Sequence, residues 1–221
     1  MIRLAPTKAR KGNDIMAMTI VYEVGDKLYV NLTNKCPCSC TFCIRHNGDG
    51  AYGSDSLWLD REPEPDEVIE AFEKADYKKY SEIVFCGYGE PTERLEVLRA
   101  AAKYIKDNSS VPTRLNTNGL SDLIHGRDTA KELEGLLDTV SISLNAGTVD
   151  EYLKVTRPKF GEEAYTAMQR FASQCKEYVP NVVFTVVDVI GDEEIKAAQE
   201  VADKAGVKLR VRKYESGDNE K

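Results

Sequence analysis

Short runs in which apolar and polar positions alternate are spaced along the chain, and longer amphipathic stretches separate them. Alternation with a period of two predicts a strand, and apolar positions that recur every three to four residues predict a helix. An additional short strand is expected at 19–24, because Gly25-Asp26 turns the chain back into the next run. The other predicted strands are 28–33, 82–86, 113–116, 139–145, 182–188 and 208–214, and the predicted helices are 65–80, 93–106, 129–137, 162–178 and 192–205.

The order of these elements predicts an α/β fold. Strands that alternate with helices are typical of βα units and of a mainly parallel sheet. About six such units are too few for a closed eight-fold barrel, so the pattern fits an open, partial TIM-like barrel or a doubly wound sheet. In both architectures ligands bind at the C-terminal ends of the strands. We therefore expect functional residues directly after the predicted strands.

The predicted strand 82–86 runs into the sequence Gly87-Tyr88-Gly89-Glu90-Pro91. Glycines permit a close approach of the backbone and unusual φ values. The carboxylate of Glu90 is placed to accept hydrogen bonds from a cationic ammonium group. The other interpretation is a tight connection between strand and helix, in which Pro91 opens the next helix.

Polar side chains also accompany the next two predicted strands. Asn116 is hard to explain as a core residue. Ser141, Ser143 and Asn145 share one face of their strand, because successive side chains point to opposite faces. In a parallel sheet that is covered on both sides, such a polar face lines a cavity. We therefore predict that these residues form a cavity wall.

The last predicted strand repeats this alternation, with Arg210, Arg212 and Tyr214 on one face. Arginines that face a cavity would indicate an anionic ligand. An edge strand that turns its arginines to solvent is the other interpretation, and the sequence leaves both open.

Composition narrows the function classes. With 42% hydrophobic and 30% charged residues the chain has the composition of an ordinary globular protein. Its net charge of −7 argues against general nucleic-acid binding. The longest apolar run, 182–187, is too short to span a bilayer, and no secretory signal is expected at the start. We expect a cytoplasmic protein, with residues 1–17 as a weakly ordered extension and residues 18–221 as one domain.

Three cysteines carry the strongest chemical signal. Cys36, Cys40 and Cys43 form a Cys-x3-Cys-x2-Cys array after the predicted strand 28–33. Three thiolates can hold three corners of a cubane iron–sulfur cluster, whereas electron carriers normally use four cysteines. An open metal position is typical of reactive rather than structural sites. A structural zinc site is the alternative, but it usually draws two separated Cys/His pairs. Cys38 could be a fourth ligand, but its spacing would strain simultaneous ligation, so we expect it beside the cluster.

Together these segments resemble the radical S-adenosylmethionine (radical SAM) superfamily. The resemblance rests on a Cys-x3-Cys-x-aromatic-Cys array with Phe42 at the aromatic position, on the Gly-Glu-Pro motif, and on softer Thr-Asn-Gly and Ser-x-Asn motifs. It covers roughly residues 22–214. The small size, Cys38 and the sequence around Trp58 also resemble small radical SAM proteins encoded beside TatD-type hydrolases.

The resemblance implies a partial TIM-like barrel and a set of roles. Cys36, Cys40 and Cys43 would ligate a [4Fe-4S] cluster, whose fourth iron binds the amine and carboxylate of S-adenosylmethionine. Within the cofactor site, Phe42 would lie near the adenine and Glu90 would hold the methionine amine. The full set of implied contacts is Phe42, Gly87, Tyr88, Gly89, Glu90, Asn116, Ser143 and Asn145.

The implied activity is reductive cleavage of S-adenosylmethionine, which gives a 5′-deoxyadenosyl radical for hydrogen abstraction from a small-molecule or peptide substrate. A flavodoxin or ferredoxin would supply the electron. Two narrower activities fit less closely. Glycyl-radical activases commonly carry His-Asn near the last cysteine, and here two residues separate His46-Asn47 from Cys43. The 7-carboxy-7-deazaguanine synthases usually place Asp-Thr directly after that cysteine, where this chain has Ile44-Arg45.

Two classes without catalytic activity compete with this interpretation. One is an iron–sulfur electron-transfer protein, and the other is a zinc-stabilised interaction module. Neither class requires the glycine–glutamate turn or the polar strand faces.

Overall fold

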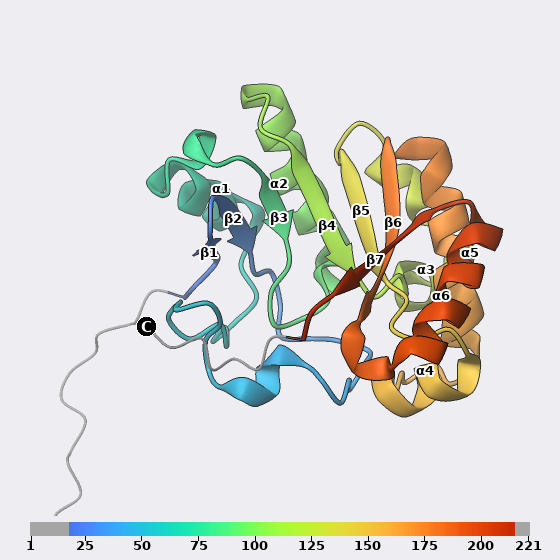
Figure 1. Ribbon diagram of the computed structural model, residues 1–221. Helices are drawn as coiled ribbons and strands as arrows, with labels where there is room; N and C mark the ends of the chain where they lie inside the picture. Colours follow the sequence, from blue (N-terminus) through green and yellow to red (C-terminus); the bar gives the residue numbers. More distant parts are fainter. Residues whose placement is uncertain (1–17, 215–221) are drawn as a thin grey trace, which may run out of the picture.

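The strands of the computed structural model form one sheet in the same order as they occur in the sequence (Figure 1). The structure describes residues 18–214. The first pair of strands is antiparallel and all later pairs are parallel. The strands are β1 (Val21–Val24), β2 (Lys27–Val30), β3 (Ile83–Phe85), β4 (Thr113–Thr117), β5 (Thr139–Ser143), β6 (Asn181–Val187) and β7 (Lys208–Arg212).

This strand order decides between the two architectures that the sequence left open. A doubly wound sheet reverses its strand order at a switch point, whereas here the order runs from β1 to β7 without reversal. Within the described residues the sheet does not pair β7 with β1, so the barrel is open. The predicted partial TIM-like barrel with about six parallel units and a short N-terminal strand is confirmed.

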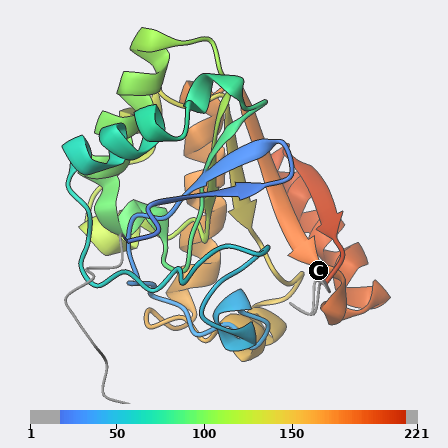
Figure 2. The same cartoon turned by 90° about the vertical axis from the view of Figure 1, so that its left-hand side faces the viewer.

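The helices pack on one side of the sheet (Figures 1 and 2). Their bounds are α1 (Pro65–Lys74), α2 (Leu95–Asn108), α3 (Ser121–His125), α4 (Val149–Thr156), α5 (Glu163–Tyr178) and α6 (Asp192–Ala205). The core lies between helices and sheet, where Phe171 of α5 and Phe184 of β6 are completely buried. No helix within residues 18–214 is both long and apolar enough to cross a membrane.

Two predicted helices are wrong in extent. The predicted helix 65–80 ends at Lys74, because Asp76 adopts a left-handed φ of 52° that an α-helix does not tolerate. The predicted helix 129–137 is only a short 3₁₀ turn, Ala130–Leu133. Gly126 and Gly135, with φ values of 65° and 69°, end the helical conformation of the backbone on either side of this turn.

Helix α4 was absent from the sequence prediction. It is eight residues long and begins at the Thr148 cap, whose hydroxyl accepts a hydrogen bond from the Glu151 amide at 3.4 Å. The predicted strand 139–145 is too long by two residues. Strand β5 ends at Ser143, and Asn145 adopts a left-handed φ of 63°. The predicted extension 1–17 lies outside the described residues.

Replacing Phe171 with alanine is expected to destabilise the fold, because it leaves a large cavity between α5 and the sheet. We expect a loss of about 3–5 kcal/mol in the free energy of unfolding, measured by urea titration. Ser173→Ala, on the exposed side of the same helix, should change this free energy by less than about 0.5 kcal/mol. Equal effects of the two substitutions would contradict the packing described here.

Candidate functional site

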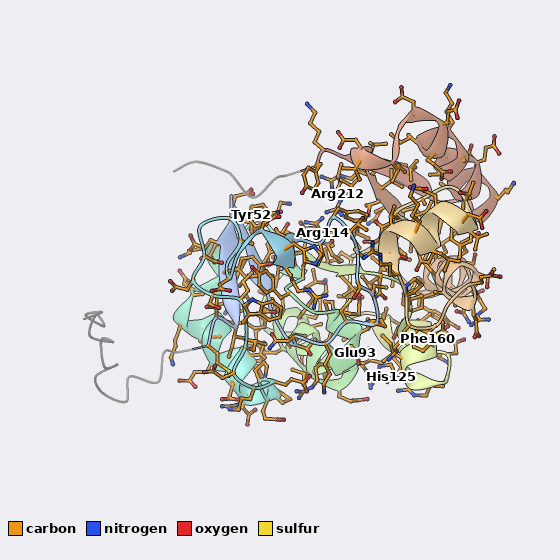
Figure 3. The ribbon with its side chains drawn as sticks, turned by 90° about the horizontal axis from the view of Figure 1, so that it is seen from below. Tyr52, Glu93, Arg114, His125, Phe160 and Arg212 are labelled. Atoms are coloured by element: carbon orange, nitrogen blue, oxygen red, sulfur yellow. The ribbon has the colours of Figure 1, made fainter. Side chains whose placement is uncertain are left out.

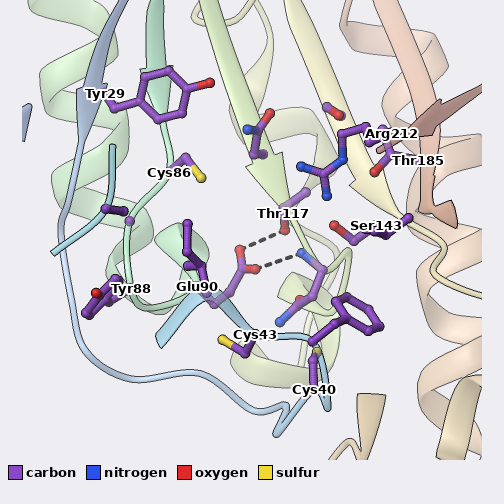
Figure 4. Close-up of a pocket in the computed structure, with 18 of the residues that line it drawn as sticks. Tyr29, Cys40, Cys43, Cys86, Tyr88, Glu90, Thr117, Ser143, Thr185 and Arg212 are labelled. Atoms are coloured by element: carbon purple, nitrogen blue, oxygen red, sulfur yellow. Dashed lines mark hydrogen bonds between the residues drawn. The ribbon is translucent and has the colours of Figure 1, made fainter. Parts of the chain in front are cut away.

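A cavity of about 560 Å³ lies at the C-terminal ends of the parallel strands (Figure 4). This volume is in the range typical of small-molecule sites, roughly 300–1,000 Å³. The wall combines residues from the ends of β3 to β7 with the loop that carries the cysteines. It contains the three expected cluster cysteines and all the implied cofactor contacts, namely Cys36, Cys40, Phe42, Cys43, Gly87, Tyr88, Gly89, Glu90, Asn116, Ser143 and Asn145. The expected convergence on one strand-end site is therefore observed.

The cysteine loop is attached to the end of helix α4. The backbone amides of Ser39 and Thr41 donate hydrogen bonds to the carbonyls of Thr156 and Val155, at 2.9 and 2.8 Å. The last carbonyls of a helix have no partner within the helix, so they are available as acceptors. The helix that the sequence pattern missed thus positions the middle of the cysteine array.

Cys38 differs from the other cysteines of the array. Its side chain is buried in the core, whereas Cys36, Cys40 and Cys43 are only partly buried. Hydrogen bonding from the Cys38 thiol lowers the pKa of Cys36 and of Cys40, and the same bonds raise the pKa of Cys38 itself. Thiolates rather than thiols bind metals. This arrangement supports Cys38 as a neighbour of the cluster, which stays a prediction.

Cys36, Cys40 and Cys43 lie along one loop at the cavity wall. In a cubane cluster each thiolate would bind a separate iron. Within residues 18–214 no group of three His, Cys, Asp or Glu side chains suited to one metal ion is found. The role of the three cysteines as cluster ligands stays a prediction.

Arg45 contacts the array, which sequence spacing alone did not indicate. Its Nε donates a hydrogen bond to Cys43 Sγ at 3.3 Å. Its guanidinium carbon lies 5.9 Å from the centre of the Trp58 ring, a cation–π arrangement that holds the side chain in place. A positive charge is thereby fixed beside the last cysteine.

The glycines after β3 are required by the chain that leaves β2. A Cβ at Gly87 would lie 2.2 Å from Asn31 Oδ1, and a Cβ at Gly89 would lie 2.3 Å from the Thr33 carbonyl oxygen. The Glu90 amide donates to the Lys35 carbonyl at 2.8 Å. The close approach predicted for these glycines is thus present, and its partner is the segment that leads directly into Cys36.

The carboxylate of Glu90 joins the ends of β3 and β4. Its Oε1 accepts hydrogen bonds from the Thr92 amide and hydroxyl, at 3.1 and 2.8 Å, and from the Thr117 hydroxyl at 2.7 Å. Its Oε2 accepts one from the Asn118 amide at 2.7 Å (Figure 4). Burial raises the pKa of Glu90, although the bonds from Asn118 and Thr117 act in the opposite direction. The expected contact with a ligand ammonium stays a prediction, and Oε2, with a single partner, is the oxygen better able to make it.

Two buried amide oxygens in the wall lack partners. The Oδ1 atoms of Asn116 and Asn145 are buried and accept no hydrogen bond within the described part of the chain. Leaving a buried acceptor unsatisfied costs about 1–3 kcal/mol. Native structures retain few such atoms, and each requires an explanation. Both residues line the cavity, and their roles as cofactor contacts stay a prediction.

Replacing Glu90 with glutamine should destabilise the protein even without any ligand. The amide nitrogen of glutamine cannot accept a hydrogen bond, so either the Asn118 amide or the Thr92 amide loses its acceptor. We expect a loss of about 1–3 kcal/mol in the free energy of unfolding. Glu93→Gln, at a partly exposed carboxylate nearby, is the matched control. An unchanged denaturation midpoint for Glu90→Gln would show that the carboxylate does not hold the two strand ends together.

Several solved structures share this fold. The first is SuiB from Streptococcus suis, bound to its precursor peptide SuiA, with a TM-score of 0.65 and 14% identity over 86% of this chain and 39% of SuiB. A second is anSMEcpe with bound AdoMet and the Cp18Cys peptide, with a TM-score of 0.58 and 21% identity over 86% of this chain and 49% of that one. A radical SAM methyltransferase from Sphaerobacter thermophilus gives a TM-score of 0.56 and 16% identity over 87% of this chain and 68% of that one.

These likenesses show the fold, and the chain spans only about two fifths of the length of SuiB. A search of curated proteins gives no match. The model of the Radical SAM superfamily matches residues 30–205, which include the cysteine array, the glycine–glutamate turn and the polar ends of β4 and β5. The chain therefore belongs to the radical SAM superfamily, whose cofactors are a [4Fe-4S] cluster and S-adenosylmethionine.

Proposed function

We propose that this chain is a radical SAM enzyme in which Cys36, Cys40 and Cys43 hold the cluster and the strand-end cavity holds S-adenosylmethionine and a substrate. One observation carries the proposal: the three thiols and the two unpartnered amide oxygens, of Asn116 and Asn145, line the same cavity. An electron-transfer protein would need the thiols but would have no use for buried acceptors beside them.

The cofactors, when bound, supply a one-electron cleavage of the sulfonium S–C5′ bond, which gives methionine and a 5′-deoxyadenosyl radical able to take a hydrogen atom from a substrate. The protein contributes position and enclosure. The amide oxygens of Asn116 and Asn145 would accept hydrogen bonds from ribose hydroxyls, and Phe42 would lie beside the adenine. The backbone from Gly87 to Gly89, with Glu90, would receive the methionine amine. The surrounding wall restricts water and side reactions.

The setting and partners follow from the same chemistry. An external reductant of the flavodoxin or ferredoxin type is required. All six cysteines are free, as expected in a reducing cytoplasm. SuiB and anSMEcpe were crystallised with peptides. Both proteins are much longer than this chain, so we do not infer a peptide substrate for this chain from them. The closer resemblance to TatD-associated proteins stays a prediction.

Anaerobic reconstitution with iron, sulfide, reductant and S-adenosylmethionine, followed by chromatography, should yield 5′-deoxyadenosine. Single alanine substitutions of Cys36, Cys40 and Cys43 should each abolish both the cluster absorption and this product, because three ligands are the minimum for the site. Cys38→Ala should keep both and serves as the matched control. Loss of the cluster in Cys38→Ala with retention in Cys36→Ala would overturn the ligand assignment, and product formation without a cluster would overturn the proposed function.

Arg45 should tune the cluster electrostatically. A cation that donates to a cysteine sulfur stabilises the reduced, more negative cluster. Arg45→Leu is therefore expected to shift the reduction potential to more negative values, as measured by a redox titration followed by electron paramagnetic resonance. Arg45→Lys keeps the charge and should shift the potential less. A potential that is the same in all three proteins would mean that Arg45 serves only to hold the loop.

A further inference from the structure

We propose that the substrate is a small molecule that carries an oxyanion, either a carboxylate or a phosphate, and that Arg212 and Arg210 of β7 bind this group together with Arg114 of β4. The inference deepens the proposed function and rests on it, because it names the class of molecule that shares the cavity with S-adenosylmethionine.

The first support is the charge of the cavity wall. The chain carries a net charge of −7, yet the lining residues include four cationic side chains, Arg114, Arg210, Arg212 and Lys213. Among the described residues the wall holds one carboxylate, Glu90, and its oxygens already accept four hydrogen bonds. A concave site lined by one sign of charge concentrates ligands of the opposite sign.

The second support is that the β7 arginines have no partner of their own. Neither Arg210 nor Arg212 makes an ion pair or a side-chain hydrogen bond in the part of the chain that the structure describes. Figure 4 shows Arg212 directed into the pocket toward Ser143 and Thr185. Leu209, on the opposite face of the strand, packs against the core. Arg210 and Arg212 are exposed to solvent and also line the cavity, so this edge strand turns its arginines to the open side of the cavity.

Arg114 is held in place with one donor left over. Its side chain is only 12% exposed, and its Nη2 pairs with Glu82 Oε2 at 2.9 Å. Its Nε is buried and has no acceptor within residues 18–214. A guanidinium presents its donors in a rigid fork that suits carboxylate and phosphate oxygens. Glu82 thus fixes the group, and the free Nε remains for a ligand.

The arginines lie away from the cysteines. Along β4 the cavity face carries Arg114 and Asn116, and Asn118 follows, with its Nδ2 3.9 Å from Cys36 Sγ. At about 3.3 Å per residue, Arg114 lies about 13 Å along the strand from Asn118. Seen from below, Arg114 and Arg212 lie in the same part of the molecule (Figure 3). Burial raises the pKa of the Cys86 thiol, and the charges of both arginines act in the opposite direction. The space between these arginines and the cysteine loop is where the cofactor would bind.

The size of the cavity favours a small molecule. Its 560 Å³ has to accommodate S-adenosylmethionine as well as the substrate. Volumes of roughly 300–1,000 Å³ are typical for a single drug-sized ligand. The remaining room suits a compact anion better than a peptide segment.

The test measures anion binding to the anaerobically reconstituted protein with S-adenosylmethionine bound. Inorganic phosphate, malonate and the uncharged malonamide are titrated by calorimetry into the wild type and the double variant Arg210→Gln/Arg212→Gln. We expect wild type to bind phosphate or malonate but not malonamide, and the double variant to bind the anion at least about tenfold more weakly. The anion that binds more tightly shows whether the oxyanion of the substrate is a phosphate or a carboxylate. Lys208→Gln removes one charge from an exposed position of the same strand and should leave binding unchanged.

Equal anion binding by the wild type and the double variant would overturn the inference, and so would an equal weakening of anion binding by Lys208→Gln. A parallel loss of S-adenosylmethionine affinity in the double variant would also overturn it, because it would assign the arginines to the cofactor. Tighter binding of an acidic peptide than of either small anion would also overturn it, in favour of a peptide substrate. Cluster absorption and 5′-deoxyadenosine formation are recorded on the same samples. Their absence would refute the proposed function, whereas their presence without anion binding would refute only this inference.

Discussion

The docking of the turn after β3 against the chain that leaves β2 is the constraint on which the site depends. Gly87 and Gly89 allow the two segments to approach to distances at which any Cβ would overlap Asn31 or Thr33. The Glu90 amide then binds the carbonyl of Lys35, the residue directly before Cys36. Its carboxylate ties the same turn to β4 through Thr117 and Asn118. A single buried residue therefore sets where the cysteine array begins relative to two strands of the sheet.

The middle of the array depends on a different element. Helix α4 offers its last carbonyls to the amides of Ser39 and Thr41, groups that would otherwise remain unsatisfied. The loop is thereby fixed at its start by the β3 turn and in its middle by α4. Loops are the usual place for functional residues, but they require such support to hold a defined geometry. Arg45, held over Trp58, continues this support beyond Cys43.

The residues of the cavity wall include several polar groups that lack partners within residues 18–214. Asn116 Oδ1, Asn145 Oδ1 and Arg114 Nε make no hydrogen bond there, and Arg210 and Arg212 make no ion pair in that part of the chain. A ligand of complementary chemistry would remove the cost of leaving such groups unsatisfied. Under the two proposals, hydrogen-bond donors of the cofactor would pair with the asparagines, and an oxyanion of the substrate would pair with the arginines. The two requirements are separated along β4, as two ligands in one cavity would need.

The sequence by itself determined the fold class, the array of cysteines and the identity of the residues at the strand ends. It could do so because period-two patterns, glycine-rich turns and thiol spacing are local properties that a chain displays without folding. Sequence pattern did not reveal α4, since eight residues give little periodicity, and it could not decide which face of β7 carries the cavity. It also could not show that Glu90 binds Thr117 and Asn118, or that Arg45 reaches Cys43. Those facts belong to the tertiary structure, because packing between segments distant in sequence decides which side chains meet and which polar atoms remain without a partner.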